Sequence, residues 1–295
     1  MKQPIHALVA TITKKLETEY HDLMLAQQTA WWLLEALTKL TQAQLIVQQE
    51  LELSKEQEQQ LAAWVTEITT KHKPLQYILG SVPFANLEIL VKPPILIPRP
   101  ETEEFVLNLI DQLKAFKNEK LSILDVGTGT GCIALALAKA LPHATITGID
   151  IDSRALALAR TNAQHNNIHN VVLSESDVYA NLGTYQTFDL IVSNPPYIAP
   201  EEWQALEPSV TQWENPGALL APHEGLAIIE RIIKDAPTHL KRDSALHKNR
   251  MAQLIIEIGY MQGPAIKQLM EQHEFTRVEI KKDLEGKDRT VWGYL

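Results

Sequence analysis

The sequence predicts an α/β fold in which a mostly parallel sheet of seven strands ends in an antiparallel hairpin, with a small helical bundle before it. Three observations predict this fold. Apolar, strand-like runs alternate with helical stretches after Pro100, the last two runs are separated by only four residues, and residues 1–74 have helical periodicity throughout. The 295 residues are enough for one medium-sized domain and one small one.

The composition narrows the functional classes. Hydrophobic residues make up 45% of the chain and charged residues 21%, which is typical of a protein with a buried core. The net charge of −9 provides no basic field for nucleic acid or anionic lipid. Cys132 is the one cysteine, and the ten histidines lack metal-ligand spacing, so neither disulfides nor a metal site are expected. With no signal peptide and no membrane-spanning run, we expect a cytoplasmic protein that does not bind membranes. We also expect a monomer, although no sequence feature reports on self-association.

Residues 1–74 are expected to form the helical domain. Two capping boxes mark helix starts, Thr41 with Gln44 and Ser54 with Gln57. After the second box, apolar residues recur on one helix face, at Leu61, Trp64, Val65 and Ile68. The adjacent Trp31 and Trp32 are both interpreted as core residues.

Glycine and proline break the next stretch into short β-prone runs. Residues 75–98 are therefore interpreted as a hairpin or a linker, and residues 99–295 as the second domain. Within that domain the expected parallel strands are 121–127, 144–150, 170–176, 188–194 and 254–260, and the expected hairpin joins 275–284 to 289–295. The polar stretch at 237–251, "PTHLKRDSALHKNRM", is expected to be an exposed, mobile connection.

The first chemical motif is "LDVGTGTGCIAL", which joins the first parallel strand to its helix. Gly127, Gly129 and Gly131 allow a tight turn and a close approach of a ligand to the main chain. A nicotinamide dehydrogenase normally spaces these glycines as G-x-G-x-x-G to face a pyrophosphate, whereas the spacing here is G-x-G-x-G. A glycine turn without a ligand is the alternative. Cys132, which follows directly, is interpreted as a small packing residue.

Two further strand ends carry acidic residues. Asp150 ends the second strand, where a carboxylate can accept both hydroxyls of a ribose, while Asp152 is interpreted as a helix cap. After the third strand, Asp177 and Val178 are candidates for one polar contact and one apolar wall around an adenine.

The fourth strand ends in "SNPPY", at the sheet edge where open α/β folds place their ligands. Asn194 has an amide oxygen that can accept a hydrogen bond, and Pro195 fixes the backbone without adding an N–H donor. Together with Pro196 and the flat face of Tyr197, such acceptors suit a planar, conjugated NH₂ group, whose nitrogen is a poor nucleophile. Two acceptors would orient the nitrogen lone pair toward an electrophile.

The glycine spacing and the terminal hairpin resemble those of class I S-adenosylmethionine-dependent methyltransferases, and "NPPY" resembles the motif of adenine-specific DNA methyltransferases and protein-glutamine methyltransferases. Three further segments, "PLQYILG", "LIPRPETEEFV" and "DLEGKDRTVWG", resemble the peptide-chain-release-factor glutamine methyltransferases, the PrmC/HemK family. This resemblance covers nearly the whole chain.

The resemblance implies methyl transfer from S-adenosylmethionine to the glutamine amide in the Gly-Gly-Gln motif of class I release factors, docked by the helical domain. The residues implied to hold the cofactor are Gly127, Thr128, Gly129, Thr130, Gly131, Asp150, Asp177, Val178 and Asn194. Those implied to bind and activate the glutamine amide are Asn194, Pro195, Pro196 and Tyr197. Arg99 and Glu101 either order the domain junction or simply start a helix. A DNA adenine methyltransferase and a non-catalytic module that binds translation factors are the alternatives.

The chain departs from the family pattern at three places, one of which is the polar stretch at 237–251. Many relatives have an aromatic residue at the position of Val178, so an expected stacking partner for adenine is missing. The usual Glu-Pro after the "NPPY" loop is interrupted here by Asn215 between Glu214 and Pro216.

Overall fold

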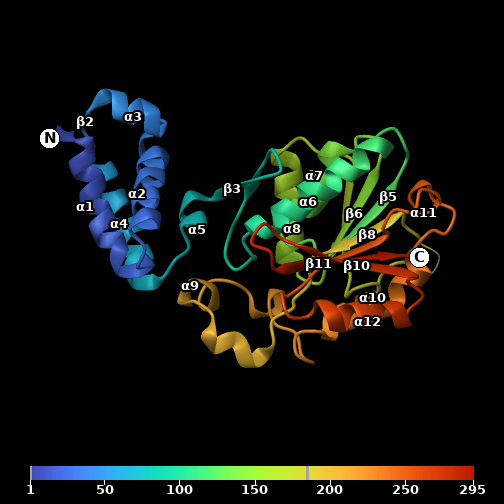
Figure 1. Cartoon of the computed structure of the whole chain (residues 1–295). Coiled ribbons are helices and arrows are strands. Elements are labelled where there is room, and N and C mark those ends of the chain that lie inside the picture. Colours follow the sequence, from blue (N-terminus) through green and yellow to red (C-terminus); the bar gives the residue numbers. More distant parts are fainter. Residues whose placement is uncertain (1, 184–185) are drawn as a thin grey trace. The chain divides into compact units, whose positions relative to one another are not determined.

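The computed structural model describes residues 2–183 and 186–295. The chain divides into two compact units (Figure 1). The first contains residues 1–80 together with 207–213, and the second contains residues 81–206 and 214–295.

The first unit is a helical bundle with one short pair of strands. Its helices are α1 (Ile5–Tyr20), α2 (Leu23–Thr38), α3 (Gln42–Gln48), α4 (Lys55–Lys71), α5 (Leu75–Leu79) and α9 (Pro208–Thr211). The expectation of an entirely helical segment was wrong in one detail, because β1 (Gln3–Pro4) pairs antiparallel with β2 (Glu50–Leu51). Both capping boxes are confirmed, with Thr41 and Ser54 as the N-caps of α3 and α4.

The two adjacent tryptophans of α2 differ in burial. Trp31 is only 6% exposed and belongs to the core of the bundle, as predicted. Trp32 is 40% exposed, so its interpretation as a core residue was wrong. The reason is geometric. The buried residues of α2 occupy one broad side of the helix, and at about 100° per residue Trp32 lies on the opposite side.

A seven-stranded sheet forms the centre of the second unit. Its order is β10-β11-β9-β8-β5-β6-β7. The five parallel strands are β5 (Ser122–Val126), β6 (Thr145–Asp150), β7 (Val171–Glu175), β8 (Leu190–Ser193) and β9 (Leu254–Glu257). The terminal hairpin consists of β10 (Arg277–Lys282) and β11 (Asp288–Tyr294), and β11 also pairs antiparallel with β9. The predicted fold class and terminal hairpin are therefore confirmed.

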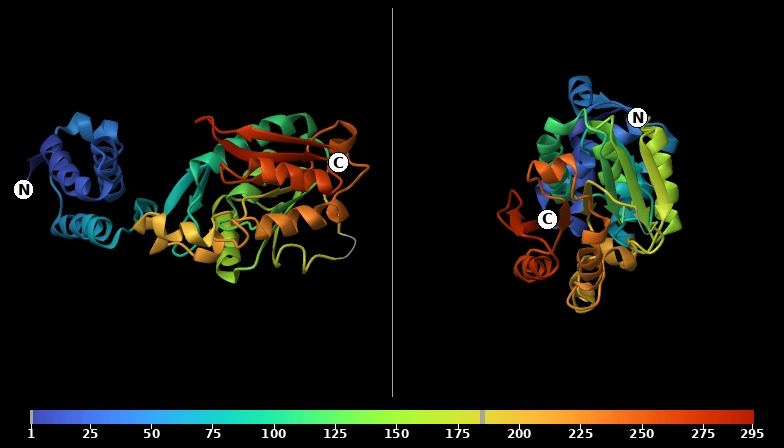
Figure 2. Two further views of the ribbon diagram at one scale, coloured as in Figure 1. Left: turned by 60° about the horizontal axis from the view of Figure 1, so that its bottom comes forward. Right: turned by 90° about the vertical axis from the view of Figure 1, so that its right-hand side faces the viewer.

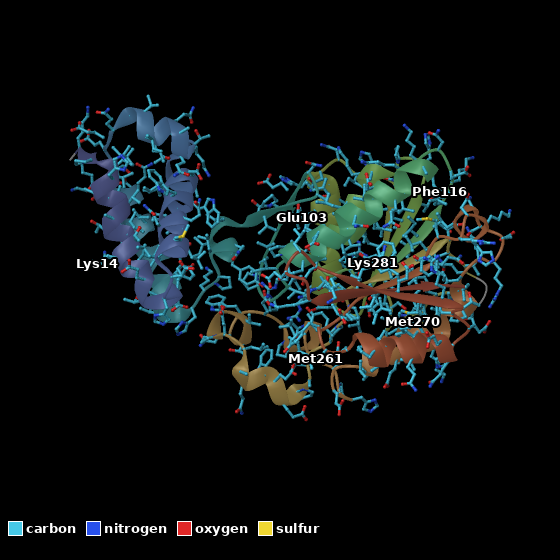
Figure 3. All side chains as sticks on the ribbon, viewed as in Figure 1. Lys14, Glu103, Phe116, Met261, Met270 and Lys281 are labelled. Carbon is cyan, nitrogen blue, oxygen red and sulfur yellow. The ribbon has the colours of Figure 1, made fainter. Side chains whose placement is uncertain are left out.

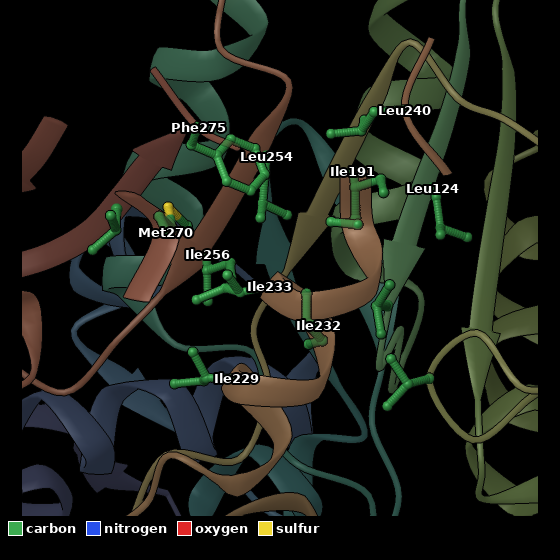
Figure 4. Close-up of a cluster of buried hydrophobic side chains, with 14 of the residues drawn as sticks. Leu124, Ile191, Ile229, Ile232, Ile233, Leu240, Leu254, Ile256, Met270 and Phe275 are labelled. Atoms are coloured by element: carbon green, nitrogen blue, oxygen red, sulfur yellow. The ribbon is translucent and has the colours of Figure 1, made fainter. Parts of the chain in front are cut away.

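Helices cover both faces of this sheet (Figures 1 and 2). One face carries α6 (Pro100–Leu113), α7 (Cys132–Ala140) and α8 (Ser153–His165), and the other carries α10 (Ala227–His239) and α12 (Gly263–Gln272). Short elements complete the unit: η1 (Lys114–Phe116), η2 (Pro200–Ala205), η3 (Pro216–Ala218) and α11 (Ala245–Lys248). Buried side chains of α10 and α12 pack against the sheet strands (Figure 4). Burial on both faces explains why the central strands are almost wholly apolar.

A small hairpin begins the second unit. Strands β3 (Ser81–Phe84) and β4 (Leu87–Leu90) pair antiparallel across a two-residue turn in which both residues have positive φ. The Ala85 N–H of this turn donates to Glu103 of α6 at 2.8 Å; Glu103 is labelled in Figure 3. At the other end, the Leu90 N–H donates to Asn162 of α8 at 2.7 Å. Polar side chains from two helices therefore hold the hairpin against the rest of the second unit.

The stretch at 237–251 is more buried than expected. Leu240 is 4% exposed, Ser244 is 6% exposed and Leu246 is fully buried. The Lys241 ammonium also pairs with the buried Asp189 at 2.9 Å. The prediction of an exposed connection was therefore wrong for these residues, because a few apolar side chains inside a polar stretch are enough to bury part of it, whereas residues 242–243 and 248–250 are exposed as expected.

Within the described residues, no helix is both long enough and apolar enough to cross a lipid bilayer.

Candidate active site

The glycine loop leaves the carboxyl end of β5 and leads into α7. Gly127, Gly129 and Gly131 have φ values of 73°, 56° and 83°, which strain any residue with a side chain. A Cβ added at Gly129 would meet nothing within 4 Å, so the main chain is open there. A Cβ at Gly131 would lie 3.1 Å from the Cβ of Ala159 in α8. Gly131 therefore allows helix packing, while Gly129 leaves space for a ligand.

Buried side chains support this loop from below. Thr128 and Thr130 are 3% and 2% exposed. The Thr128 hydroxyl donates to Asp125 Oδ2 at 2.7 Å, and the Ala134 N–H donates to the same oxygen at 3.2 Å. Burial raises the pKa of Asp125 to about 7. Its second oxygen, Oδ1, is buried and has no hydrogen-bond partner among the described residues.

The Asp150 carboxylate lies at the end of β6, the strand beside β5. Its Oδ2 accepts from the Gly129 N–H at 2.8 Å and its Oδ1 from the Asp152 N–H at 2.9 Å. Burial raises the pKa of Asp150, and these N–H donors counteract the effect. Asp152 caps α8 by accepting from the Arg154 N–H at 2.8 Å, which confirms its interpretation as a helix cap.

Asp177 and Val178 occupy different environments after β7. Asp177 is exposed and pairs with Arg231 at 2.9 Å. Val178 is 8% exposed, belongs to the core cluster and has a φ of 52°. That conformation is unfavourable for a β-branched residue. The structure thus places Val178 mainly in the core.

The "NPPY" loop leaves the end of β8, next to the glycine loop. The Ser193 hydroxyl donates to the Val126 carbonyl oxygen at 2.7 Å and ties the two strand ends together. A Cβ added at Gly127 would lie 3.9 Å from the main-chain oxygen of Asn194, so the loops are neighbours. A pocket opens over the second loop, lined by Leu96, Arg99, Asn194, Pro195, Pro196, Tyr197, Ile198, Ala218 and Leu219.

Two acceptors of the loop are free of partners. Among the described residues, no hydrogen bond reaches Asn194 Oδ1 or the Pro195 carbonyl oxygen. The other end of the Asn194 amide is engaged, because Nδ2 donates to the Thr102 hydroxyl at 3.0 Å. Thr102 in turn donates to the buried Glu257 at 2.7 Å, and Glu257 also accepts from the Tyr197 hydroxyl at 3.4 Å. Burial raises the pKa of Tyr197, so its hydroxyl stays protonated.

Close packing fixes the far end of the loop. Gln262 Nε2 donates to the Tyr197 carbonyl oxygen at 2.9 Å and to the Glu224 carbonyl oxygen at 3.0 Å. A Cβ added at Gly225 would lie 2.0 Å from the same Tyr197 oxygen. Only glycine fits there, so the loop has no room to shift in that direction.

Arg99 and Glu214 form an ion pair at the mouth of the pocket. Glu214 is 4% exposed, accepts from Arg99, and also accepts from the Ile97 N–H at 3.3 Å. Burial raises the pKa of Glu214, and the Arg99 charge counteracts the effect. Asn215, the residue that departs from the family pattern, caps η3 and donates its N–H to the Pro94 carbonyl oxygen at 2.8 Å. The insertion is therefore accommodated by a local cap.

Comparisons with known proteins identify the family. Residues 8–80 match a protein-family model described as the PrmC N-terminal domain, and residues 104–212 match one described as the methyltransferase small domain. A protein of Streptococcus pneumoniae named release factor glutamine methyltransferase is 40% identical over 242 residues, which is 81% of each chain. One of Lactococcus lactis with the same name is 37% identical over 96% of this chain and 97% of its own. The chain belongs to the release factor glutamine methyltransferase family.

Solved structures support the fold of this methyltransferase. The catalytic domain of human Mettl16, solved with an RNA hairpin, aligns with a TM-score of 0.53 at 14% identity and covers 83% of this chain and 82% of its own. A Thermus thermophilus 16S rRNA methyltransferase, solved with AdoMet and guanosine, aligns with a TM-score of 0.50 at 16% identity, over 72% of this chain and 49% of its own. At these identities the likeness shows the fold alone.

The methyl donor of the family, S-adenosylmethionine, fits the residues at this sheet edge. The open main chain at Gly129 and the Asp150 carboxylate beside it suit the cofactor's backbone and its ribose hydroxyls. The orphaned, buried oxygen of Asp125 lies beneath the same loop, where a cationic or protic group is needed to satisfy it. When bound, the cofactor supplies a methyl group on a positively charged sulfur.

Sequence reasoning missed three residues of this methyltransferase. Asp125 is the last but one residue of the buried strand β5, and Glu257 is the last residue of β9. An acidic residue within or at the end of an apolar strand was the available signal for both. Thr102 gave no signal, because a threonine in the first turn of a helix is ordinary.

Cys132 is buried, and burial raises its pKa to about 12, which confirms it as a packing residue. Among the described residues, no group of three or more potential metal ligands comes together.

Proposed function

We propose that this chain transfers a methyl group from S-adenosylmethionine to the side-chain amide nitrogen of the glutamine in the Gly-Gly-Gln motif of class I peptide chain release factors. The observation that carries the proposal is the pair of free acceptors, Asn194 Oδ1 and the Pro195 carbonyl oxygen, beside the glycine loop. The names of the relatives point to the same substrate.

These acceptors match the two hydrogens of a primary amide. An amide nitrogen is a poor nucleophile because its lone pair is delocalised into the carbonyl group. Hydrogen bonds from both of its N–H groups to Asn194 and Pro195 orient the nitrogen, and they favour the positive charge that develops on it during transfer. Tyr197 offers an aromatic face for the planar amide, and its hydroxyl is held away by Glu257.

For the cofactor we propose contacts from Gly127, Gly129 and Asp150, with Asn194 shared between cofactor and substrate. Thr128, Thr130 and Gly131 contribute by shaping the loop, since all three are buried. We propose that Asp177 and Val178 border the adenine from the end of β7. Val178 can offer apolar contact there but no stacking.

Adenine in DNA also presents a conjugated NH₂ group, so a DNA substrate is the second candidate. The chain's net charge of −9 opposes binding to a polyanion. We propose that the protein acts as a cytoplasmic monomer, without direct nucleic-acid contact, and that the first unit docks the release factor.

Mass spectrometry of a release factor incubated with enzyme and cofactor tests the function. We expect one added methyl group on one glutamine, and no transfer to an adenine-containing duplex oligonucleotide. Asn194→Ala removes one acceptor and should lower the rate about a hundredfold or more, by analogy with the loss of one hydrogen bond to a developing charge. Methylation of the duplex but not of the release factor would contradict the proposal.

A further inference from the structure

A continuous chain of hydrogen bonds lies behind the proposed substrate amide site. It runs from Asn194 Nδ2 to the Thr102 hydroxyl at 3.0 Å, and from that hydroxyl to Glu257 Oε2 at 2.7 Å. The other carboxylate oxygen, Oε1, accepts from the Tyr197 hydroxyl at 3.4 Å. Thr102 and Glu257 are 2% and 1% exposed, so no solvent competes for these bonds.

The ionised carboxylate of Glu257 determines which group donates and which accepts in each of these hydrogen bonds. A carboxylate of Glu257 can only accept, so the Thr102 hydroxyl must give its single hydrogen to it. The Thr102 oxygen is then left with lone pairs alone, and it can accept only from the NH₂ end of the Asn194 amide. The oxygen end of that amide is thereby turned toward the pocket.

The opposite orientation of Asn194 would defeat the proposed site. If its NH₂ group faced the pocket, donors would meet the donors of the substrate NH₂ group, and no hydrogen bond could form between Asn194 and the substrate nitrogen. The backbone of Asn194 cannot prevent such a flip, because an amide has nearly the same shape in both orientations. The Asn194 amide therefore needs a hydrogen-bond partner that can only accept, so that its NH₂ end is fixed toward that partner.

We infer that Thr102 and Glu257 are positioning residues that hold the Asn194 amide with its oxygen toward the substrate nitrogen. The inference rests on the proposed role of Asn194. It accounts for a buried acidic residue at the end of β9, where an apolar residue would pack at lower cost.

Protonation of Glu257 should reverse the direction of these hydrogen bonds. A protonated carboxyl can donate to Thr102, whose hydroxyl is then free to donate to Asn194 Oδ1, so that the amide turns over. Burial raises the pKa of Glu257 to about 7. Four charged or titratable groups face it from the surrounding elements: Arg289 on β11, Glu101 on α6, Tyr197 after β8 and Cys132 on α7. Arg289 lowers this pKa and Glu101 raises it, while Tyr197 and Cys132 stay neutral near pH 7.

The first test replaces the hydroxyl of Thr102. Thr102→Val should lower the single-turnover rate of methyl transfer to a release factor tenfold to a hundredfold, as expected for a misplaced reacting group, with little change in KM. Thr102→Ser restores the hydroxyl and should recover most of the lost rate. Thr147→Val, a buried threonine in the middle of β6, is the matched control and should keep the wild-type rate. Calorimetry with S-adenosylmethionine checks that each variant is folded.

The second test uses pH and does not depend on Thr102→Val being stable. The wild-type rate should rise with pH from 6 to 8, and the part of this rise that belongs to Glu257 should be absent in Glu257→Gln, whereas Asp125, whose pKa is also raised to about 7, titrates in both enzymes. A rise of the same size in Glu257→Gln, or a Thr102→Val enzyme with the full wild-type rate, would overturn the inference. If Asn194→Ala itself remains active, the proposed amide site fails instead, which separates the two outcomes.

Discussion

The Asp150 carboxylate illustrates, at the scale of single residues, how one group can shape a loop and also bind a ligand. It accepts from the Gly129 and Asp152 N–H groups, one on each oxygen. Each oxygen keeps a lone pair for another donor. A carboxylate held this way is already desolvated and oriented, so a ribose diol meets a rigid acceptor.

Asp150→Ala should weaken the binding of S-adenosylmethionine about tenfold to a hundredfold, because hydrogen bonds to a charged group are worth about 1.5–3 kcal/mol. Isothermal calorimetry measures the change. Asp152→Ala is the control: it removes the cap of α8 and should cost about 1 kcal/mol of stability with little effect on affinity. Equal losses of affinity in both variants would mean that Asp150 acts only through the loop.

Glu257 links activity to stability. Its pKa is raised from 4.5 to about 7 in the folded protein, and at about 1.4 kcal/mol per unit this amounts to about 3 kcal/mol. The folded state binds the proton more tightly than the unfolded state, so the contribution is present below about pH 4.5 and is lost as pH rises through 7.

Wild-type protein should therefore lose thermal stability relative to Glu257→Gln as pH increases from 5 to 8. Differential scanning calorimetry at several pH values measures the difference in Tm, and comparison with a single variant cancels the other titrating groups. A constant difference would show that Glu257 does not titrate in this range. If the difference grows, the same ionisation that favours the active orientation of Asn194 also costs stability.

At the scale of elements, the helices of the first unit depend on their ends as well as on their apolar faces. The N-cap of α4 is a complete capping box, in which Ser54 and Gln57 satisfy each other's main-chain N–H groups at 3.2 and 3.0 Å. Leu61, Val65 and Ile68 bury one face of the same helix. The cap therefore determines where α4 begins, and the row of apolar residues determines which side of the helix faces the core.

Ser54→Ala should destabilise α4 by about 1 kcal/mol, which is about a fivefold increase in the exchange rate of its amides. Hydrogen–deuterium exchange mass spectrometry of peptides from residues 55–71 detects this. Thr66→Ala, at an exposed position within the same helix, is the control and should be neutral or slightly stabilising, because alanine is the better helix former. Equal exchange in the two variants would contradict the role of the cap.

At the scale of the whole molecule, the chain is two units with separate cores. The first unit carries exposed apolar side chains that its own core does not use. Leu25 and Trp32 are 42% and 40% exposed and lie seven residues apart on α2, so they share one side of the helix. This side is our candidate for the surface that docks a release factor.

Replacing both Leu25 and Trp32 by lysine should raise the KM for a release factor about tenfold and leave kcat unchanged, since buried aromatic contacts contribute most to such interfaces. Steady-state methylation assays provide both constants. Lys14→Ala, on the exposed side of α1, is the control. An unchanged KM in the double variant would assign docking to another surface.

The sequence by itself determined the features that are local along the chain. Apolar runs of strand length, the G-x-G-x-G spacing and the two capping boxes each act within a few residues, so they could be interpreted correctly without coordinates. The restricted backbone of the Asn-Pro-Pro-Tyr stretch is local in the same sense, because proline restricts the backbone wherever it occurs, while its role at the amide site stays a prediction.

Only the tertiary structure decided what depends on distant neighbours. Thr102 and Glu257 are 155 residues apart in the chain, yet they share a hydrogen bond behind Asn194. The exposure of Trp32 and the burial of Leu246 depend on which side of a helix meets a core. The reason is physical: a single residue's propensity is worth a few tenths of a kcal/mol, whereas burial and polar pairing set by packing are worth several times more.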